Sequence, residues 1–177
     1  MDILWIEASD LEEGSDLYDE SWDKLKSSHG ILVPGGFGDR GTQGKILATR
    51  YSRENDVPFL GICLGLQIAV IEAAQNLLNI PNASSEEFDP DSEEIVIKFM
   101  PEGHRTKMGG TMRLGRRETF FKEKNCKIYK LYKKLWNVEY SVHERHRHRY
   151  EVNIDYLERL ESIGIKFVGH DVDMERQ

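Results

Sequence analysis

The residue whose setting most suggests chemistry is Cys63, in the stretch GICLG at positions 61–65. It stands between an apolar run at 58–62 with the length of a buried strand and an apolar run at 64–80 with the length of a helix. Glycines two positions to either side permit a tight turn, which is typical of a nucleophile elbow. Because a helix N-terminus favours thiolate over thiol, we expect Cys63 to be a nucleophile. The alternative is a small buried cysteine that caps a core helix.

Two backbone segments are suited to holding negative charge beside this thiol. The Leu64 N–H is freed at the start of the expected helix, and Gly35 and Gly36 of PGGFG (34–38) can turn their N–H groups toward an oxyanion. A glycine turn without a function is the alternative for that loop. Cys126 has no elbow around it, and we interpret it as structural or incidental.

Short apolar strands alternate with helical segments through the first 80 residues. The strands are expected at 2–8, 30–34 and 58–62, and the helices before Gly30, at 45–57 and at 64–80. This order predicts an α/β fold with a doubly wound, mostly parallel sheet between two layers of helices. Ligands of such sheets bind beyond the carboxyl ends of the strands, where the glycine-rich corners at 35–38 and 61–65 both fall.

The pattern changes after residue 92. Strands at 93–101 and 108–121 indicate a β-hairpin excursion from the parallel sheet, and a short helix is expected at 125–136. An extended segment at 143–153, a helix at 154–164 that ends near Gly164, and a last strand from 165 follow.

The stretch HERHRHRYE (143–151) has three interpretations. It is a solvated charged strand, or a metal site made by His146 and His148, or a carboxylate clamp in which Arg145, Arg147 and Arg149 share one strand face. The metal interpretation is the weakest, because the interleaved arginines repel a cation and no third ligand is evident. We therefore expect no metal site.

Charge is unevenly distributed along the 177 residues, whose net charge is −7. Residues 1–100 carry 7 basic and 19 acidic side chains, whereas residues 101–150 carry 14 basic and 5 acidic ones. A basic segment in an acidic chain favours a small anionic ligand or a partner's acidic face over long nucleic acid, and the alternative is a solvated basic face. With two cysteines, no apolar run of membrane-spanning length and no basic leader, we expect a cytoplasmic protein that binds neither nucleic acid nor membranes.

Several longer stretches carry a resemblance to a known family. GILVPGGFGDRGTQGK, RENDVPFLGICLGLQIAVIE, NASSEEFDPD, MGGTMRLG and ERHRHRYEVN together resemble the C-terminal glutamine amidotransferase domain of the CTP synthase family. The pattern GGFG followed by GxCxGxQ is shared by class I amidotransferases, which have a flavodoxin-like sheet. The segments GGTMRLG and ERHRHRYEVN are far narrower patterns and resemble those of CTP synthases.

The resemblance implies a function and a site. Family members hydrolyse glutamine at a cysteine that matches Cys63, and pass ammonia to a synthetase domain that makes CTP from UTP and ATP in pyrimidine biosynthesis. The oxyanion would be held by Gly36 and Leu64, the α-ammonium by Glu87 and the α-carboxylate by Arg149. The glutamine site as a whole would comprise Gly36, Leu64, Gly65, Leu66, Gln67, Glu87 and Arg149.

The resemblance also implies partners and a regulator. The amidotransferase domain needs no cofactor of its own, whereas the full enzyme uses ATP and Mg, with GTP as an activator that acts near MGGTMRLG. L-glutamine, the synthetase domain and the other subunits of a homo-oligomer would be the partners.

One feature of the family pattern is missing. The family's general base belongs to a His-Pro-Glu motif, and no histidine of this sequence begins a His-x-Glu or His-x-Asp triplet. We therefore expect residues 1–177 to be one amidotransferase domain truncated at its C-terminus, with impaired glutaminase activity. The alternatives are a regulatory or oligomer-binding module and another elbow-type cysteine hydrolase.

Overall fold

The computed structural model describes residues 2–100 and 113–171. They form two compact units. The first comprises Met1–Phe99 and Tyr150–Leu160, and the second comprises Met100–Arg149 and Glu161–Gln177. In the described part of the chain, no helix combines the length and the apolar composition needed to cross a bilayer.

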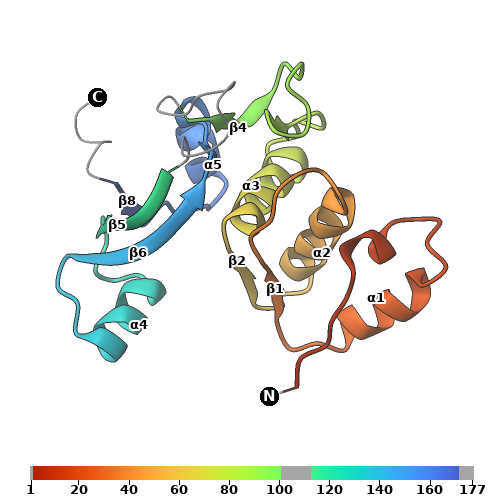
Figure 1. The fold of residues 1–177 in the computed structure, drawn as a ribbon, viewed down its shortest axis with the longest axis horizontal. Coiled ribbons are helices and arrows are strands. Elements are labelled where there is room, and N and C mark those ends of the chain that lie inside the picture. The colour runs from red at the N-terminus through yellow and green to blue at the C-terminus, as the bar shows by residue number, and fades with distance from the viewer. Residues whose placement is uncertain (1, 101–112, 172–177) are drawn as a thin grey trace. The chain divides into compact units, whose positions relative to one another are not determined.

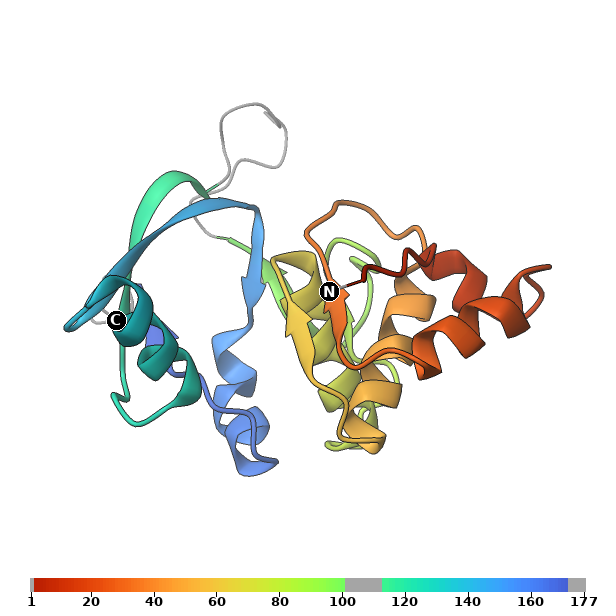
Figure 2. The same cartoon turned by 90° about the horizontal axis from the view of Figure 1, so that it is seen from below.

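A parallel pair of short strands organises the first unit. Strands β1 (Ile31–Val33) and β2 (Phe59–Gly61) pair in parallel, with Leu32 opposite Leu60, and Figure 2 shows them side by side. Helices α2 (Thr42–Glu54) and α3 (Leu64–Asn76) each follow a strand and pack against each other (Figure 1). This strand–helix–strand–helix order confirms the α/β class expected from the sequence.

The core beside β1 is closed by the N-terminal elements. Helix α1 (Tyr18–Lys26) and the 3₁₀ turn η1 (Ala8–Leu11) contribute Leu25 and Leu11, which are buried with Ile31, Val33 and Ala48. The Trp22 indole N–H donates to the Leu11 carbonyl over 3.1 Å, which joins α1 to η1. The helix expected before Gly30 is thereby confirmed.

Helix α3 is buried over most of its surface, as its apolar sequence predicts. Ile68 and Ile71 are no more than 1% exposed. Glu72, on the same helix, is also 1% exposed and pairs with Arg53 of α2, whose Nη2 lies 2.8 Å from Glu72 Oε1. Because a buried carboxylate is costly without a cationic partner, this pair fixes α2 against α3.

The remaining elements of the first unit extend from the end of α3. Strand β4 (Ile95–Phe99) pairs in parallel with β3 (Ser84–Ser85) and antiparallel with β7 (Tyr150–Val152). The 3₁₀ turn η2 (Ile154–Tyr156) and helix α5 (Leu157–Ser162) follow β7, and the first unit ends within α5, at Leu160.

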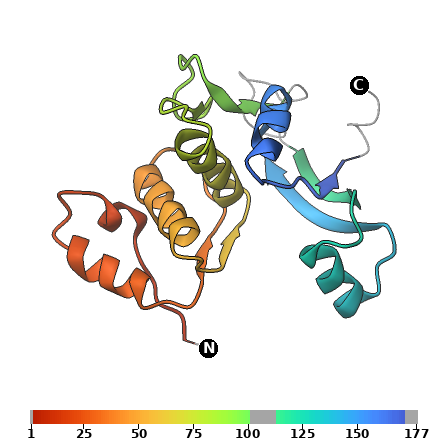
Figure 3. The same ribbon diagram turned by 180° about the vertical axis from the view of Figure 1, so that it is seen from behind.

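The second unit is built on an antiparallel pair. Strand β5 (Arg113–Phe121) pairs with β6 (Ser141–His148) and, at its far end, with β8 (Gly169–His170). Helix α4 (Lys127–Trp136) lies in the connection between β5 and β6, as Figures 1 and 3 show. Phe121 makes ring contacts with Tyr129 and Tyr132 of α4, which attach this helix to the strands.

Three expectations about individual elements were wrong. Residues 2–7 form no strand: Trp5 is 84% exposed, and none of the described residues supplies the hydrogen-bonded neighbour that a strand needs. The antiparallel excursion is present, but among the described residues β5 (Arg113–Phe121) pairs with β6 and β8 and not with β4. The extended segment at 143–153 is interrupted at Arg149, a bend between β6 and β7.

The Gly44→Ala substitution tests the packing of α2 on η1. Alanine favours a helix over glycine by about 1 kcal/mol. A Cβ at position 44 would, however, lie 1.8 Å from the Ala8 carbonyl oxygen, which belongs to backbone. We expect the clash to prevail and to lower the free energy of unfolding by about 1–3 kcal/mol in urea denaturation.

The control is Gly30→Ala, whose Cβ would meet the Pro58 carbonyl oxygen at an ordinary 3.5 Å. Its free energy of unfolding should stay within about 0.5 kcal/mol of the parent value. A Gly44→Ala chain as stable as the parent would contradict this account of the packing.

Candidate active site

Cys63 occupies a strained turn between β2 and α3. Its φ is 54° and its ψ is −105°, a combination that side-chain-bearing residues rarely adopt. A Cβ on Gly61 would lie 2.5 Å from the Gly65 carbonyl atoms, and a Cβ on Gly65 would lie 2.1 Å from the Val33 carbonyl oxygen. The turn can therefore form only because both flanking residues are glycines, as a nucleophile elbow requires.

The glycine-rich loop between β1 and α2 lies directly against this turn. A Cβ placed on Gly35 would be 3.3 Å from Cys63 Cβ and 3.9 Å from its Sγ. A Cβ placed on Gly36 would be 3.2 Å from Leu64 Cδ2. The two backbone segments singled out from the sequence are thus in contact, with the sulfur beside Gly35.

Glu87 is attached to the same loop. Its Oε1 accepts a hydrogen bond from the Gly38 N–H over 3.0 Å, although the two residues are 49 positions apart. The Glu87 N–H in turn donates to Oγ of Ser85, a fully buried residue of β3, over 3.1 Å. The carboxylate is therefore held between β3 and the glycine-rich loop.

The ionisation of Cys63 departs from the expectation of an activated thiolate. Partial burial raises the pKa of the Cys63 thiol, the nearby Glu87 carboxylate raises it further, and a hydrogen bond from the Leu64 N–H lowers it. The helix N-terminus does act in the expected direction, but burial outweighs it. Burial therefore makes the thiolate of Cys63 harder to form than that of an exposed cysteine.

The first turn of α3, which was expected to bind glutamine, contains both buried and exposed residues. Leu64 and Gly65 are buried, whereas Leu66 is 50% exposed. Gln67 is 6% exposed, and its Nε2 donates to the Tyr150 carbonyl oxygen over 3.1 Å. The Gln67 side chain thus joins α3 to β7 within the first unit.

Arg149 belongs to the second unit. Its carbonyl oxygen accepts the Met100 N–H over 2.9 Å, and its Nε is buried. The bend at this residue separates it from the strand that carries Arg145 and Arg147, so the three arginines do not form the continuous face expected from alternation.

His146 and His148 share one face of β6, as alternation predicted. Nδ1 of His146 lies 3.0 Å from Nε2 of His148, and burial, aided by Arg113, lowers the pKa of His146. Within residues 2–100 and 113–171, no group of three or more His, Cys, Asp or Glu side chains is arranged to hold a metal ion. The MGGTMRLG segment lies largely outside the described residues.

Sequence reasoning missed Gly38 and Ser85 as parts of this site. Gly38 has a φ of 78°, and PGGFG signalled a turn at that position without indicating what its N–H would bond. Ser85 precedes Glu87 by two residues, a spacing at which serine often accepts a backbone N–H.

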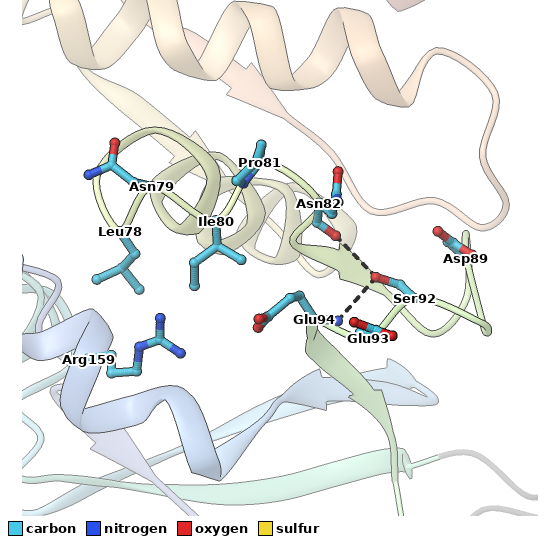
Figure 4. Close-up of a pocket in the computed structure, with 10 residues that line it drawn as sticks. All are labelled: Leu78, Asn79, Ile80, Pro81, Asn82, Asp89, Ser92, Glu93, Glu94 and Arg159. Atoms are coloured by element: carbon cyan, nitrogen blue, oxygen red, sulfur yellow. Dashed lines mark hydrogen bonds between the residues drawn. The ribbon is translucent and has the colours of Figure 1, made fainter.

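A separate cavity of about 520 Å³ lies at the other end of α3. Figure 4 shows Leu78, Ile80 and Glu94 directed toward Arg159 there. Glu94 also accepts the Tyr156 hydroxyl, and burial together with this bond raises the pKa of Tyr156 to about 12. Since Cys63 precedes α3 and these residues follow it, this cavity is not part of the thiol site.

The sequence matches a known protein family. Residues 1–175 match the family described as Glutamine amidotransferase class-I. A CTP synthase of Candida glabrata is 50% identical over 185 residues, which cover 99% of this chain and 31% of that protein. A CTP synthase of Dictyostelium discoideum is 53% identical, with 97% of this chain and 31% of that protein covered.

A solved structure agrees with these sequence matches. It is described as the glutaminase domain of Trypanosoma brucei CTPS with bound acivicin, and it superposes with a TM-score of 0.84 at 40% identity over 95% of this chain and 61% of that one. The expected flavodoxin-like fold is confirmed by this likeness. The chain spans about a third of the length of the curated relatives it matches and belongs to the class-I glutamine amidotransferase family.

Proposed function

We propose that this chain hydrolyses L-glutamine as the amidotransferase domain of a CTP synthase and supplies ammonia to a synthetase domain for pyrimidine nucleotide synthesis. The observation that carries the proposal is the strained turn that sets Cys63 against the glycine-rich loop at Gly35 and Gly36. The likeness to CTP synthases along nearly the whole chain supports it. The family match at 1–175 disfavours an inert module or an unrelated cysteine hydrolase.

The proposed chemistry begins with attack of the Cys63 thiolate on the side-chain amide carbon of glutamine. The oxygen of the tetrahedral intermediate receives hydrogen bonds from the N–H groups of Gly36 and Leu64. The C–N bond then breaks as the nitrogen takes up, through solvent, the proton that the Cys63 thiol lost on ionising, so ammonia leaves and a γ-glutamyl thioester remains. Water hydrolyses the thioester to glutamate and returns the proton to the sulfur.

The two ends of the amino acid would be held by opposite charges. Glu87 would pair with the α-ammonium and Arg149 with the α-carboxylate, for which a guanidinium is well shaped. Leu64, Gly65, Leu66 and Gln67 would form the wall of the site at the start of α3. No metal or organic cofactor enters this chemistry.

The wider reaction is proposed from the likeness to CTP synthases. The synthetase domain would use UTP, ATP and Mg, with GTP as activator, and the enzyme would act as a homo-oligomer in the cytoplasm. The basic residues of 101–150 suit an anionic partner or nucleotide near the second unit.

Covalent labelling tests the assigned nucleophile. A diazo-ketone analogue of glutamine should add once to the chain at Cys63, as located by mass spectrometry of proteolytic fragments, and glutamine should slow the addition. Cys63→Ala should abolish the adduct, whereas Cys126→Ser, the matched change at the other cysteine, should label like the parent. An adduct on Cys126, or undiminished labelling of Cys63→Ala, would refute the assignment.

The rate of glutamine hydrolysis should be low even if Cys63 is readily labelled. Proton transfer to the leaving amine contributes about 10²–10⁴-fold in enzymes of this kind, and no histidine here stands in a His-x-acid sequence. We expect ammonia release from glutamine to be slower by about this factor than in an amidotransferase with a complete cysteine–histidine pair. Comparable steady-state rates for the two proteins would show that a base has been overlooked.

The pH dependence of alkylation tests the environment of the thiol. In a Cys126→Ser background, the iodoacetamide reaction of Cys63 should have its midpoint above the usual thiol pKa, because burial and the Glu87 carboxylate both raise that pKa. Glu87→Gln removes one of these causes, so the midpoint should fall and the rate at pH 8 should rise. Glu86→Gln, which removes the neighbouring charge, should leave the midpoint unchanged. Equal shifts in both variants would show that Glu87 is not the particular carboxylate that raises the pKa of Cys63.

A further inference from the structure

The Glu87 side chain is bonded to the glycine-rich loop through one of its two carboxylate oxygens. Glu87 Oε1 accepts the Gly38 N–H over 3.0 Å. Within the described part of the chain, no hydrogen bond or ion pair to Oε2 is seen, while the backbone of Glu87 is fixed to the buried Ser85. One carboxylate can therefore hold the loop and still accept a second donor.

The position of this loop determines whether the oxyanion donors are in place. Gly38 follows Gly35 and Gly36 by only two or three residues, and those glycines lie against Cys63 and Leu64. Gly36 is half-buried, whereas Gly35 and Gly38 are exposed, so the Gly38 N–H would face solvent without an acceptor on the protein. The bond to Glu87 joins Gly38 to the turn that follows β3 in the same unit.

We propose that Glu87 is the positioning residue of the oxyanion loop, and that the same carboxylate receives the ligand's ammonium on Oε2 while Oε1 keeps Gly38 in place. This inference rests on the proposed function, which supplies the ammonium-bearing ligand. It adds that recognition of the amino group and placement of the oxyanion donors depend on one side chain.

The arrangement links substrate recognition to the reactivity of the thiol. The Glu87 carboxylate is one of the groups that raise the pKa of Cys63. An ammonium bound at Oε2 neutralises that charge, so it favours the thiolate when an amino-acid ligand is present. A ligand without an amino group lacks this effect.

Two substitutions separate the two roles of Glu87. Glu87→Gln keeps a carbonyl oxygen that can accept the Gly38 N–H but removes the charge that binds an ammonium. Glu87→Ala removes both. Asp89→Ala is the control, because it deletes an exposed carboxylate in the same turn.

The first measurement is solvent exchange of the Gly38 amide by NMR, which requires no ligand. A hydrogen bond to a charged group contributes about 1.5–3 kcal/mol, so loss of the acceptor should speed exchange by about tenfold or more in Glu87→Ala. The Gly38 exchange rate of Glu87→Gln should lie between those of the parent and Glu87→Ala, and that of Asp89→Ala should equal the parent's. Equal exchange in all four proteins would overturn the proposal.

The second measurement is the concentration dependence of Cys63 labelling by the diazo-ketone glutamine analogue. Both Glu87 variants should need higher analogue concentrations for half-maximal labelling, because the ammonium has lost its partner. The maximal labelling rate should fall about tenfold or more in Glu87→Ala relative to Glu87→Gln, because only the alanine variant releases the oxyanion loop.

The outcomes separate this inference from the proposed function. Equal maximal rates in the two Glu87 variants, with the parent labelled normally, would overturn the positioning role and leave the glutamine site intact. Absence of labelling in the parent, with the expected exchange of Gly38, would instead refute the proposed function and leave the loop contact standing.

Discussion

The close approach of three backbone segments at the corner after β2 is the constraint on which the site depends. Gly65 lies against the Val33 carbonyl and Gly61 lies against Gly65, at separations that leave no room for a Cβ. This packing forces Cys63 into a strained conformation at the start of α3 and presents its side chain beside Gly35. The strain is maintained because α3 is packed into the core and because its buried Glu72 pairs with the half-buried Arg53 of α2.

The surroundings of Cys63 raise the pKa of its thiol in the free protein. Burial and the Glu87 carboxylate raise the pKa of Cys63, and the Leu64 N–H opposes them. A permanently ionised thiol is prone to oxidation and alkylation, and the raised pKa of Cys63 makes both reactions slower in the free protein. Glu87 is central here because its carboxylate both accepts the Gly38 N–H of the loop and raises the pKa of the Cys63 thiol.

The sequence predicted the fold class and the corner, because both depend on short-range signals: the order of apolar runs and the spacing of Gly61, Cys63 and Gly65. It failed where the outcome depends on distant partners. The 2–8 segment alternates like a strand but finds no neighbour among the described residues, and β5 pairs with β6 across the connection that contains α4. The Glu87–Gly38 bond and the raised pKa of Cys63 also arise from contacts distant in sequence.

The most direct test of the account is a crystal structure of the chain after reaction with the diazo-ketone glutamine analogue. We expect a covalent bond from Cys63 Sγ to the analogue, with the analogue's carbonyl oxygen about 2.7–3.1 Å from the N–H groups of Gly36 and Leu64. An unmodified Sγ turned inward among the aliphatic side chains of α3, with the 35–38 loop displaced from it, would contradict the account.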